Sequence, residues 1–538
     1  MSASRSVRRV LSVALRVSAA CLAAAAAWPA AAAEAVPVPV LNWQPCADQQ
    51  DAGFLCSTAR VPIDYSDPEG GSFSLALIKH SADDSKNRIG TLFWNPGGPS
   101  DSGTQYMPIA IGGFPAQVTS RFDIVSWDPR GMGGDTTPVV QCFNSASDEA
   151  TFTQNLYAGL PAIPVSPSDL AKLSNARTTL NQACVAREGS LLAHVSTADN
   201  ARDLDLLRQA VGDAKISYYG TSYGTFLGAT YLNMFPGNVR AAVLDGAVYP
   251  TAWAGTGKDS RRLSTFVRIG SDIGSSETVT AFLAACGEAG VASCPFAAPK
   301  AEATQEKYQS LLESLRTNPV TIDGQAVDDT AVISYFQSSI FIIHPVPGFD
   351  RFPGYVAVAQ FLQDVWSATN AGGQSSAAAQ AAPAAVSTAS QAATYTTSYG
   401  RQAAVICGES PNPATVTANV KQALFSDRRA GLTAWPLLAI CLGWSIEAAE
   451  TYSGPWNTPT PPVLVVGNTF DPATPYSSSR RMAAELYDGH FLTVDGFGHT
   501  ELLNPSRCAQ DAIAAYLTDG TLPPDGARCA QDYRPFSR

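Results

Sequence analysis

The chain has 538 residues, of which 45% are apolar and 15% charged, and its formal net charge is −11. This length suits one large domain or two to three average ones, and the apolar share suits a well-packed globular protein. The composition excludes a largely disordered chain, and the excess of acid argues against nucleic acid or an anionic membrane as the natural partner.

The first 33 residues are typical of an export signal. Arg5, Arg8 and Arg9 form a basic start, an apolar run follows, and the sequence AAAAEA offers a cleavage site at the end. Arg16 interrupts the run, which leaves too few continuous apolar residues for a membrane anchor, and the paired arginines loosely match a twin-arginine signal. We therefore expect a secreted or periplasmic protein with no stable membrane association. Its mature net charge would be −15, because the signal removes four arginines and no acids.

Short apolar runs alternate with helical patterns along the chain, which is the signature of a parallel sheet covered by helices. We expect strands at residues 73–82, 90–95, 122–128, 216–220, 240–246, 461–468 and 490–496. Between the fourth and fifth of these, the sequence TSYGTFLGATYLNMFP predicts a buried helix that stops before Pro236. The fold class expected from this order is α/β, a mostly parallel sheet flanked by helices.

Residues 251–400 differ in character from the rest, because they have helical periodicity but no strand rhythm. Within them, residues 371–395 are rich in Ala, Ser and Gln and are typical of a flexible surface segment. We interpret residues 251–400 as a helical cap inserted into the sheet domain. The core would then comprise residues 34–250 and 401–538.

Cysteine usage agrees with export. Without Cys21 of the expected signal ten cysteines remain, an even number that falls into near neighbours. Spacing cannot fix the connectivity, but local pairing is the simplest interpretation. It pairs Cys46 with Cys56, Cys142 with Cys184, Cys286 with Cys294, Cys407 with Cys441 and Cys508 with Cys529. No Cys-x-x-Cys or clustered Cys/His spacing favours zinc, so we expect neither a metal nor another cofactor.

Residues 220–224 read Gly-Thr-Ser-Tyr-Gly and fit the pattern G-x-S-x-G, after a predicted strand and before a predicted helix. That context is the one a nucleophile elbow requires. The glycines permit the sharp turn, and the start of the helix favours negative charge near the oxygen of Ser222. An ordinary tight turn is the alternative. The motif alone does not decide, because a serine hydroxyl needs a base before it can act as a nucleophile.

A base and an acid with the required placement occur late in the chain. His499 directly follows the last predicted strand on a glycine-rich loop, where an imidazole could reach Ser222. Asp471 follows an apolar strand and precedes a proline, and the chain order Ser222, Asp471, His499 is that of an α/β-hydrolase. Asp245, at the end of an earlier strand, is the rival acid. The other histidines lie in segments that favour packing or surface roles: His80, His194, His344 and His490.

Residues 94–103, WNPGGPSDSG, follow an early strand where a hydrolase needs backbone donors for the oxyanion of the tetrahedral intermediate. The two prolines of this segment have no N–H, which leaves Gly97 or Gly98 as the natural donor, and we choose Gly98. Tyr223, the residue after the predicted nucleophile, supplies the second N–H. An ordinary Pro/Gly turn is the alternative interpretation.

Six stretches of the chain, taken in order, resemble the secreted bacterial tripeptidyl aminopeptidases, which are α/β-hydrolases related to the prolyl iminopeptidases. The stretches are NPGGPSDSG, FDIVSWDPRGMGGDTTP, RDLDLLRQAVGDAKISYYGTSYGTFLGATYLNMFPGNVRAAVLDG, PPVLVVGNTFDPATPY, GFGHTEL and CAQDAIAAYLTDGTLPPDGARC, the last from the characteristic C-terminal region of the family. The resemblance implies that Ser222 is the nucleophile, Asp471 the acid and His499 the base. It also places the Gly97-Gly98 turn in the oxyanion hole.

The chain departs from the family pattern at two positions. Ser100 stands where the family usually has glycine, and Tyr249 stands where it often has an acid. These departures bear on substrate and activity level more than on reaction class. The sequence DPRG is interpreted as a structural turn in which Asp128 and Arg130 pair.

The resemblance implies a serine exopeptidase that releases short peptides from free N-termini through an acyl-enzyme. A cap over the ends of the strands would roof the cleft and leave room for only a short stretch of substrate. A carboxylesterase is the alternative, because the same triad serves both reactions. A secreted binding protein without activity is a third hypothesis, against which the intact Ser, Asp and His argue.

An aminopeptidase should present a buried acid to the α-ammonium group of a peptide substrate, whereas an esterase pocket should be mainly apolar. Glu409, in the sequence VICGESP, is the candidate acid, with a surface or disulfide-loop role as the alternative. The sequence leaves the oligomeric state and the preferred peptide length open.

Overall fold

The computed structural model describes residues 36–47, 53–132, 135–158, 160, 164, 166–349, 352–371, 398–417 and 439–537. The expected signal at 1–33 and, apart from Ala371, the expected flexible tract at 371–395 lie outside the described residues. The chain divides into a short unit, Met1–Val36, and a second unit, Pro37–Arg538, to which all the helices and strands below belong.

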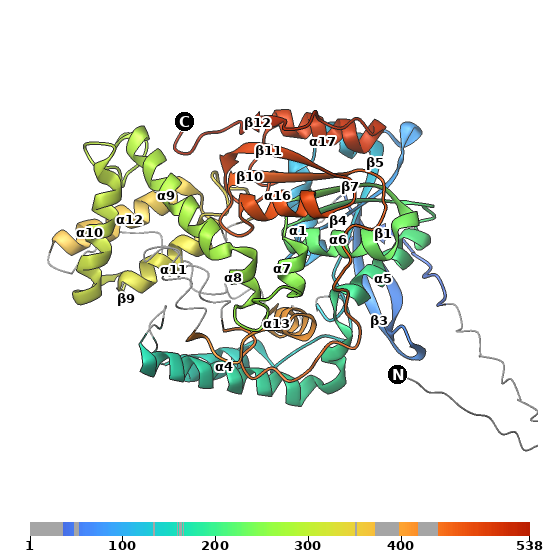
Figure 1. Ribbon diagram of the computed structural model, residues 1–538, viewed down its shortest axis with the longest axis horizontal. Helices are drawn as coiled ribbons and strands as arrows, with labels where there is room; N and C mark the ends of the chain where they lie inside the picture. The colour runs from blue at the N-terminus through green and yellow to red at the C-terminus, as the bar shows by residue number, and fades with distance from the viewer. Residues whose placement is uncertain are drawn as a thin grey trace, which may run out of the picture. The chain divides into compact units, whose positions relative to one another are not determined.

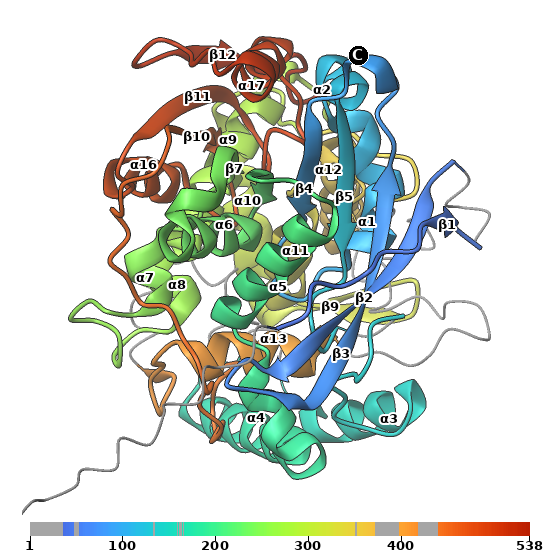
Figure 2. The same cartoon turned by 90° about the vertical axis from the view of Figure 1, so that its right-hand side faces the viewer.

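A ten-stranded sheet with the order β1-β2-β3-β5-β4-β6-β7-β10-β11-β12 forms the centre of the second unit (Figure 1). From β5 to β12 neighbouring strands are parallel, whereas β1, β2, β3 and β5 pair antiparallel at the other end (Figure 2). The strands are β1 Gln44–Pro45, β2 Leu55–Asp64, β3 Asp67–His80, β4 Gly90–Asn95, β5 Phe122–Trp127, β6 Ile216–Thr221, β7 Val239–Asp245, β10 Val463–Phe470, β11 Gly489–Phe497 and β12 Arg528–Ala530. The expected mostly parallel α/β sheet is confirmed.

Each of the seven expected strands is present. Six of them lie in the parallel part of the sheet, where apolar runs are buried from both faces, and the seventh, β3, pairs antiparallel with β2 and β5. The sequence pattern does not reveal β2, which is half exposed along much of its length and contains Pro62, a residue that weakens a strand signal. It also misses β1 and β12, which span two and three residues. The edges of the sheet are therefore the part that apolar periodicity describes least well.

Helices cover both faces of the sheet. Side chains from three helices, among them Met107, Val118 and Ile513, join the strands in one buried cluster. These helices are α1 Gly103–Ala110, α2 Ala116–Arg121 and α17 Arg507–Asp519. The other face carries α5 Thr197–Ala210, α6 Tyr223–Met234 and α16 Tyr476–Glu485, and Figure 1 shows α17 and α16 on opposite sides of β10 and β11.

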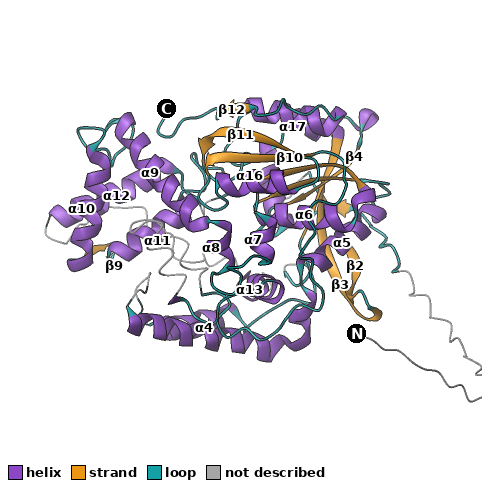
Figure 3. Ribbon diagram, viewed as in Figure 1, coloured by secondary structure: helices purple, strands orange, loops and turns teal. Residues whose placement is uncertain are grey.

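Between β7 and β10 the chain leaves the sheet, and we call residues 250–371 the inserted region. Its helices gather beside the strands in Figure 3: α7 Pro250–Ala254, α8 Thr265–Ile269, α9 Ser271–Ala289, α10 Ala303–Thr317, α11 Asp329–Ser339 and α12 Tyr355–Asn370. They have their own buried core, in which the rings of Phe282 and Phe336 are 4.9 Å apart. Leu173 joins the same core from a second excursion, between β5 and β6, which contains α3 Ala146–Tyr157 and α4 Pro167–Glu188.

The helical periodicity of residues 251–400 does not reveal two short strands in this region. Strands β8 Val320–Ile322 and β9 Gln325–Val327 form an antiparallel hairpin. Its two turn residues, Asp323 and Gly324, have φ values of 49° and 79°, as a tight Asp-Gly hairpin turn requires. Each strand spans three residues, which is too short for an alternating pattern to stand out against the surrounding helices.

All five cysteine pairs that local spacing favours are disulfides in the structure. Each bond closes a loop within one stretch of the chain, and the longest of these loops separates its two cysteines by 42 positions. The bonds join Cys46 to Cys56, Cys142 to Cys184, Cys286 to Cys294, Cys407 to Cys441 and Cys508 to Cys529. Simple pairing of near neighbours was therefore sufficient to predict the connectivity.

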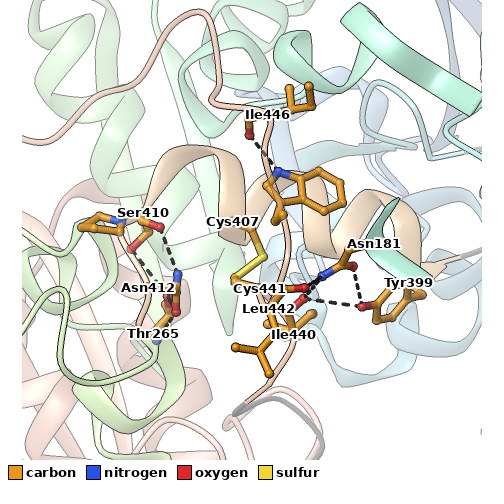
Figure 4. The surroundings of a disulfide bond; sticks show 12 residues. Asn181, Thr265, Tyr399, Cys407, Ser410, Asn412, Ile440, Cys441, Leu442 and Ile446 are labelled. Carbon is orange, nitrogen blue, oxygen red and sulfur yellow. Dashed lines mark hydrogen bonds between the residues drawn. A yellow bond between two sulfur atoms is a disulfide. The ribbon is translucent and has the colours of Figure 1, made fainter. Parts of the chain in front are cut away.

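Figure 4 shows the bond between Cys407, on α13 Ser398–Glu409, and Cys441. Asn181 of α4 donates through Nδ2 to two carbonyl oxygens beside Cys441, at 2.8 and 2.7 Å, and accepts from the hydroxyl of Tyr399 at 2.8 Å. The disulfide fastens α13 to the segment around Cys441, and the hydrogen bonds of Asn181 fasten both to α4.

The expected pairing of Asp128 with Arg130 is wrong. Arg130 is fully buried and forms a two-pronged ion pair with Asp203 of α5, with 2.5 Å between Nη2 and Oδ1 and 2.8 Å between Nε and Oδ2. Asp128 instead accepts hydrogen bonds at the start of α1, from Ser102 Oγ at 2.7 Å and from the backbone N–H of Thr104 at 2.9 Å. Each buried charge is thus satisfied by a helix that packs on the turn and not by its neighbour in sequence.

The Arg130–Asp203 pair yields a stability prediction. Replacing Asp203 by asparagine leaves the Arg130 guanidinium buried without its counter-charge, which should lower the free energy of unfolding by about 3–5 kcal/mol, as measured by urea denaturation. Asp259→Asn is the control, because its partner Arg262 is more than half exposed and such pairs contribute at most about 1 kcal/mol. Equal effects of the two substitutions would contradict the prediction.

Candidate active site

Ser222 lies at the junction of β6 and α6 with φ 56° and ψ −128°, a left-handed conformation that a residue other than glycine rarely adopts. Neighbouring groups hold it there. Its N–H donates to the carbonyl oxygen of Asp245 at 3.0 Å, and its carbonyl oxygen accepts from the N–H and the hydroxyl of Thr225 at 2.9 and 2.6 Å. The sequence GTSYG thus forms the strained strand-to-helix elbow that the motif predicts.

The two glycines of the motif are needed for close backbone contacts at this elbow. A Cβ atom on Gly220 would lie 2.4 Å from the carbonyl oxygen of Gly224. A Cβ atom on Gly224 would lie 2.5 Å from the carbonyl oxygen of Asn95, at the end of β4. A larger residue at either position would therefore push the elbow away from the sheet.

His499 and Asp471 form a buried hydrogen-bonded pair. Nδ1 of His499 is 2.9 Å from both carboxylate oxygens of Asp471, and the two side chains are 8% and 1% exposed. The carboxylate is fixed in turn by the N–H groups of Ala473 and Thr474, each at 2.9 Å, and by the Thr474 hydroxyl at 3.0 Å. Burial acts to lower the pKa of His499, but attraction and hydrogen bonding to Asp471 outweigh it, and the pKa is raised.

The structure distinguishes the two acids that the sequence leaves open. Asp245 does not supply the hydrogen bond to Nδ1 of His499. Its carboxylate accepts from the N–H groups of Glu501 and Leu502 at 2.8 and 3.0 Å and from the hydroxyl of Tyr219 at 3.2 Å. Burial raises the pKa of Asp245 to about 6. Of the two, Asp471 has the geometry of an acid that orients a histidine.

The glycine-rich loop after β4 packs directly on the elbow. Gly97 and Gly98 have φ values of 107° and 103°, and a Cβ atom on Gly97 would lie 2.7 Å from the carbonyl oxygen of Thr221 and 3.1 Å from the backbone nitrogen of Tyr223. The N–H of Gly97 donates to Oδ1 of Asn95 at 3.1 Å. Because that group is engaged, Gly98 is the better of the two for donating to a substrate.

Ser222, His499 and Gly98 line a cavity of about 220 Å³ whose wall is mainly apolar. Four of its aromatic side chains come from the inserted region, namely Phe266, Phe341, Phe349 and Phe352. Asp101, from the glycine-rich loop, supplies the one carboxylate among the described lining residues, and its charge contributes to the raised pKa of His499. The sequence signal for Asp101 is an acid in a run of small residues, two positions before the start of α1.

Glu409 is not among the residues that line the cavity. Its carboxylate accepts hydrogen bonds from the N–H and hydroxyl of Thr197 at 2.8 and 2.9 Å and from Nε1 of Trp253 at 2.8 Å. The Thr197 hydroxyl also contacts the hydroxyl of Tyr223, so Glu409 reaches the elbow only through other side chains. The structure therefore does not bring the predicted ammonium-binding acid to the nucleophile.

The two family departures lie outside the cavity wall. Ser100 is buried within the glycine-rich loop. Tyr249 precedes α7, where its N–H donates to the hydroxyl of Ser478 at 2.7 Å. Among the residues that the structure describes, no cluster of three or more His, Cys, Asp or Glu side chains could hold a metal ion.

Comparison with known proteins agrees with this geometry. A family model described as alpha/beta hydrolase fold matches residues 91–265, and one described as TAP-like protein matches residues 430–529. The chain is 31% identical to serine protease Hip1 of Mycobacterium tuberculosis, covering 91% of both chains. It is also 31% identical to carboxylesterase B of M. tuberculosis, with 92% of this chain and 91% of the relative covered. Tripeptidyl aminopeptidase of Streptomyces lividans is 27% identical, with 92% and 87% covered. The chain therefore belongs to the TAP-like α/β-hydrolases and is a serine hydrolase.

Proposed function

We propose that the protein is an exported aminopeptidase that releases short peptides from free N-termini, with Ser222 as nucleophile, His499 as base and Asp471 as the orienting acid. The observation that carries the proposal is the buried hydrogen-bonded pair between His499 Nδ1 and Asp471, with His499 lining the same cavity as the strained Ser222. With Nδ1 engaged, Nε2 is the nitrogen of His499 that can accept the serine proton.

The reaction follows from these positions. The Ser222 oxygen attacks the carbonyl carbon of the scissile peptide bond while Nε2 of His499 takes its proton. The imidazolium then donates that proton to the departing amine, and the acyl group stays on Ser222. A water molecule, deprotonated by His499, releases the acyl product and restores the serine. Asp471 stabilises the imidazolium throughout without itself taking the proton.

The N–H groups of Gly98 and Tyr223 would donate to the oxyanion of each tetrahedral intermediate. Support comes from the packing of the loop on the elbow, where a Cβ atom on Gly97 would lie 3.1 Å from the nitrogen of Tyr223. The start of α6, at Tyr223, adds the positive end of a helix dipole. Donors fixed in a water-poor cavity need no reorganisation as charge develops on the substrate oxygen.

The cap at residues 251–400 would limit the substrate to a short stretch beyond the scissile bond. Support comes from the four aromatic rings that the inserted region contributes to the cavity wall. Asp101, which lines the same cavity, would attract the α-ammonium group of a peptide. The name of one relative, tripeptidyl aminopeptidase, supports a short peptide as the substrate.

A carboxylesterase is the second candidate, and a specific observation favours it. The cavity wall is mainly apolar, as expected for an ester substrate, and one relative is named carboxylesterase B. Both reactions would use the same three residues, so only the choice of substrate separates them.

Export into an oxidising compartment, either secretion or the periplasm, is part of the proposal. Support comes from five disulfides, which persist in such compartments. None of the described helices has the length and apolar character needed to cross a membrane.

The assignment of the acid can be tested by paired substitutions. Ser222→Ala or His499→Ala should lower kcat at least about 10⁴-fold while the protein stays folded by circular dichroism. Asp471→Asn should be less severe but still large, because it favours the wrong tautomer of His499. Asp245→Asn tests the rival acid: it disturbs the contact with the N–H groups of Glu501 and Leu502 but leaves the hydrogen bond between His499 and Asp471 in place. If it removed activity while Asp471→Asn was mild, the acid would be wrongly assigned.

The oxyanion assignment predicts a large effect of one methyl group. Gly97→Ala would place its Cβ atom against Thr221 and Tyr223, and its φ of 107° disfavours alanine. We expect kcat to fall about 10²–10³-fold, the effect of losing one oxyanion donor. Gly237→Ala is the control, because nothing lies within 4 Å of the added atom. An unchanged kcat in Gly97→Ala would show that the loop is not part of the oxyanion hole.

Blocking the amino group of a peptide substrate decides between peptidase and esterase. Acetylation removes the ammonium charge of a chromogenic peptide. We expect kcat/KM to fall strongly, because the acid in the cavity no longer has an α-ammonium group to attract. Asp101→Asn should lower kcat/KM for the free peptide more than for the acetylated one. Equal cleavage of free and acetylated peptides, together with faster cleavage of simple esters, would favour the carboxylesterase.

A further inference from the structure

The loop that carries His499 is strained. Thr500 has a φ of 66°, which is rare for a β-branched residue, and Gly498 on the other side of the histidine has a φ of 88°. A Cβ atom on Gly498 would lie 2.5 Å from Oδ1 of Asn504, so this loop and Asn504 are in close contact. A strained conformation persists only where surrounding groups hold it.

The sheet supplies part of the contacts that fix the strained loop of His499. Nδ2 of Asn468, on β10, donates to the carbonyl oxygens of Gly498 and Thr500 at 3.0 and 3.1 Å. The carboxylate of Asp245, at the end of β7, accepts from the next two N–H groups of the chain, those of Glu501 and Leu502. These contacts fix the two flanks of His499 but not the histidine itself.

The inserted region supplies further contacts that fix this loop. The N–H of His499 donates to the carbonyl oxygen of Phe341 at 2.7 Å, and the Phe341 ring meets the imidazole edge to face with 5.4 Å between centroids. Asn504 is 2% exposed and joins the two segments. Its Nδ2 donates to the carbonyl oxygens of Phe341, His499 and Thr500 at 3.0, 3.0 and 3.2 Å, and its Oδ1 accepts from the N–H of Ile343 at 3.0 Å.

The inserted region also holds the turn of Asp471. From α9, the hydroxyls of Ser271 and Ser275 donate to the carbonyl oxygens of Ala473 and Pro472 at 2.6 and 2.8 Å. A Cβ atom on Gly274 of the same helix would lie 2.6 Å from the carbonyl oxygen of Asp471. Helix α9 and the turn therefore touch without room for a side chain between them.

We propose that the inserted region positions the triad as well as walling the cavity, with Phe341 and Asn504 as positioning residues for His499. The inference rests on the proposed role of His499 as the base. Without the clamp formed by Asn504 and residues 341–343, the strain at Thr500 would relax and carry the imidazole away from Ser222. Catalysis of even a small substrate, one that does not fill the cavity, would then depend on the inserted region.

The main test replaces Asn504 by aspartate, which keeps the side-chain size and an oxygen for the N–H of Ile343. An oxygen then replaces the Nδ2 donor and faces three carbonyl oxygens, so the clamp opens. Labelling to completion with a fluorophosphonate counts the working sites, and kcat for p-nitrophenyl acetate is expressed per site. We expect kcat per site to fall about 100-fold with little change in KM, the effect of a misplacement of about 1 Å.

A second variant keeps the proposal testable if Asn504→Asp does not fold. Phe341→Leu retains the backbone carbonyl but loses the ring against the imidazole, and kcat per site should fall roughly tenfold. Phe336→Leu is the control, because it removes a buried ring from the core of the inserted region without touching the cavity or His499. It should lower Tm and leave kcat per site unchanged.

The outcomes separate the inference from the proposed function. Wild-type kcat per site in the variants at Asn504 and Phe341, or an equal loss in Phe336→Leu, would overturn the positioning role. The acetate ester has no amino group, so the result does not depend on whether the enzyme recognises a free N-terminus. Equal cleavage of free and acetylated peptides would therefore overturn the aminopeptidase proposal alone.

Discussion

The buried carboxylate of Asp245 is the contact on which the arrangement of the site depends. The main chain of Asp245 accepts the N–H of Ser222, while its side chain accepts the N–H groups of Glu501 and Leu502, which follow His499. One residue at the end of a central strand therefore sets the distance between the elbow and the histidine loop. Burial raises the pKa of Asp245, and the backbone donors that bind the carboxylate act against this rise.

The order of strands explains why these groups can meet. In a parallel sheet the carboxyl ends of neighbouring strands share one edge, and β6, β7, β10 and β11 are adjacent in this sheet. Ser222, Asp471 and the loop of His499 follow β6, β10 and β11, and Asp245 is the last residue of β7. Residues more than 200 positions apart in the chain are thus brought to one edge by the sheet alone, before the inserted region adds its contacts.

The contrast between positions set by the sheet and contacts added by the inserted region also explains how much of the site could be predicted from sequence. The seven strands are apolar runs, so their pattern was sufficient to predict them, and Ser222, Asp471 and His499 were proposed because each lies at or just after the end of such a run, within two residues of a glycine or proline. The partners of Arg130 and of Glu409 are not encoded locally, because they lie 73 and 212 positions away. The contact of Asn504 with Ile343, across 161 positions, joins two irregular segments and has no periodicity from which it could be inferred.

The inserted region changes the electrostatics of the pair as well as its position. Loops at the end of an open sheet are exposed to water, where the attraction between an imidazolium and a carboxylate is weak. Here His499 is 8% exposed and Asp471 1% exposed, and the ring of Phe341 covers one side of the imidazole. Burial alone would lower the pKa of His499, yet the pKa is raised, because the same exclusion of water strengthens the interaction with Asp471. The segment that lines the cavity with aromatic rings therefore also contributes to the raised pKa of His499.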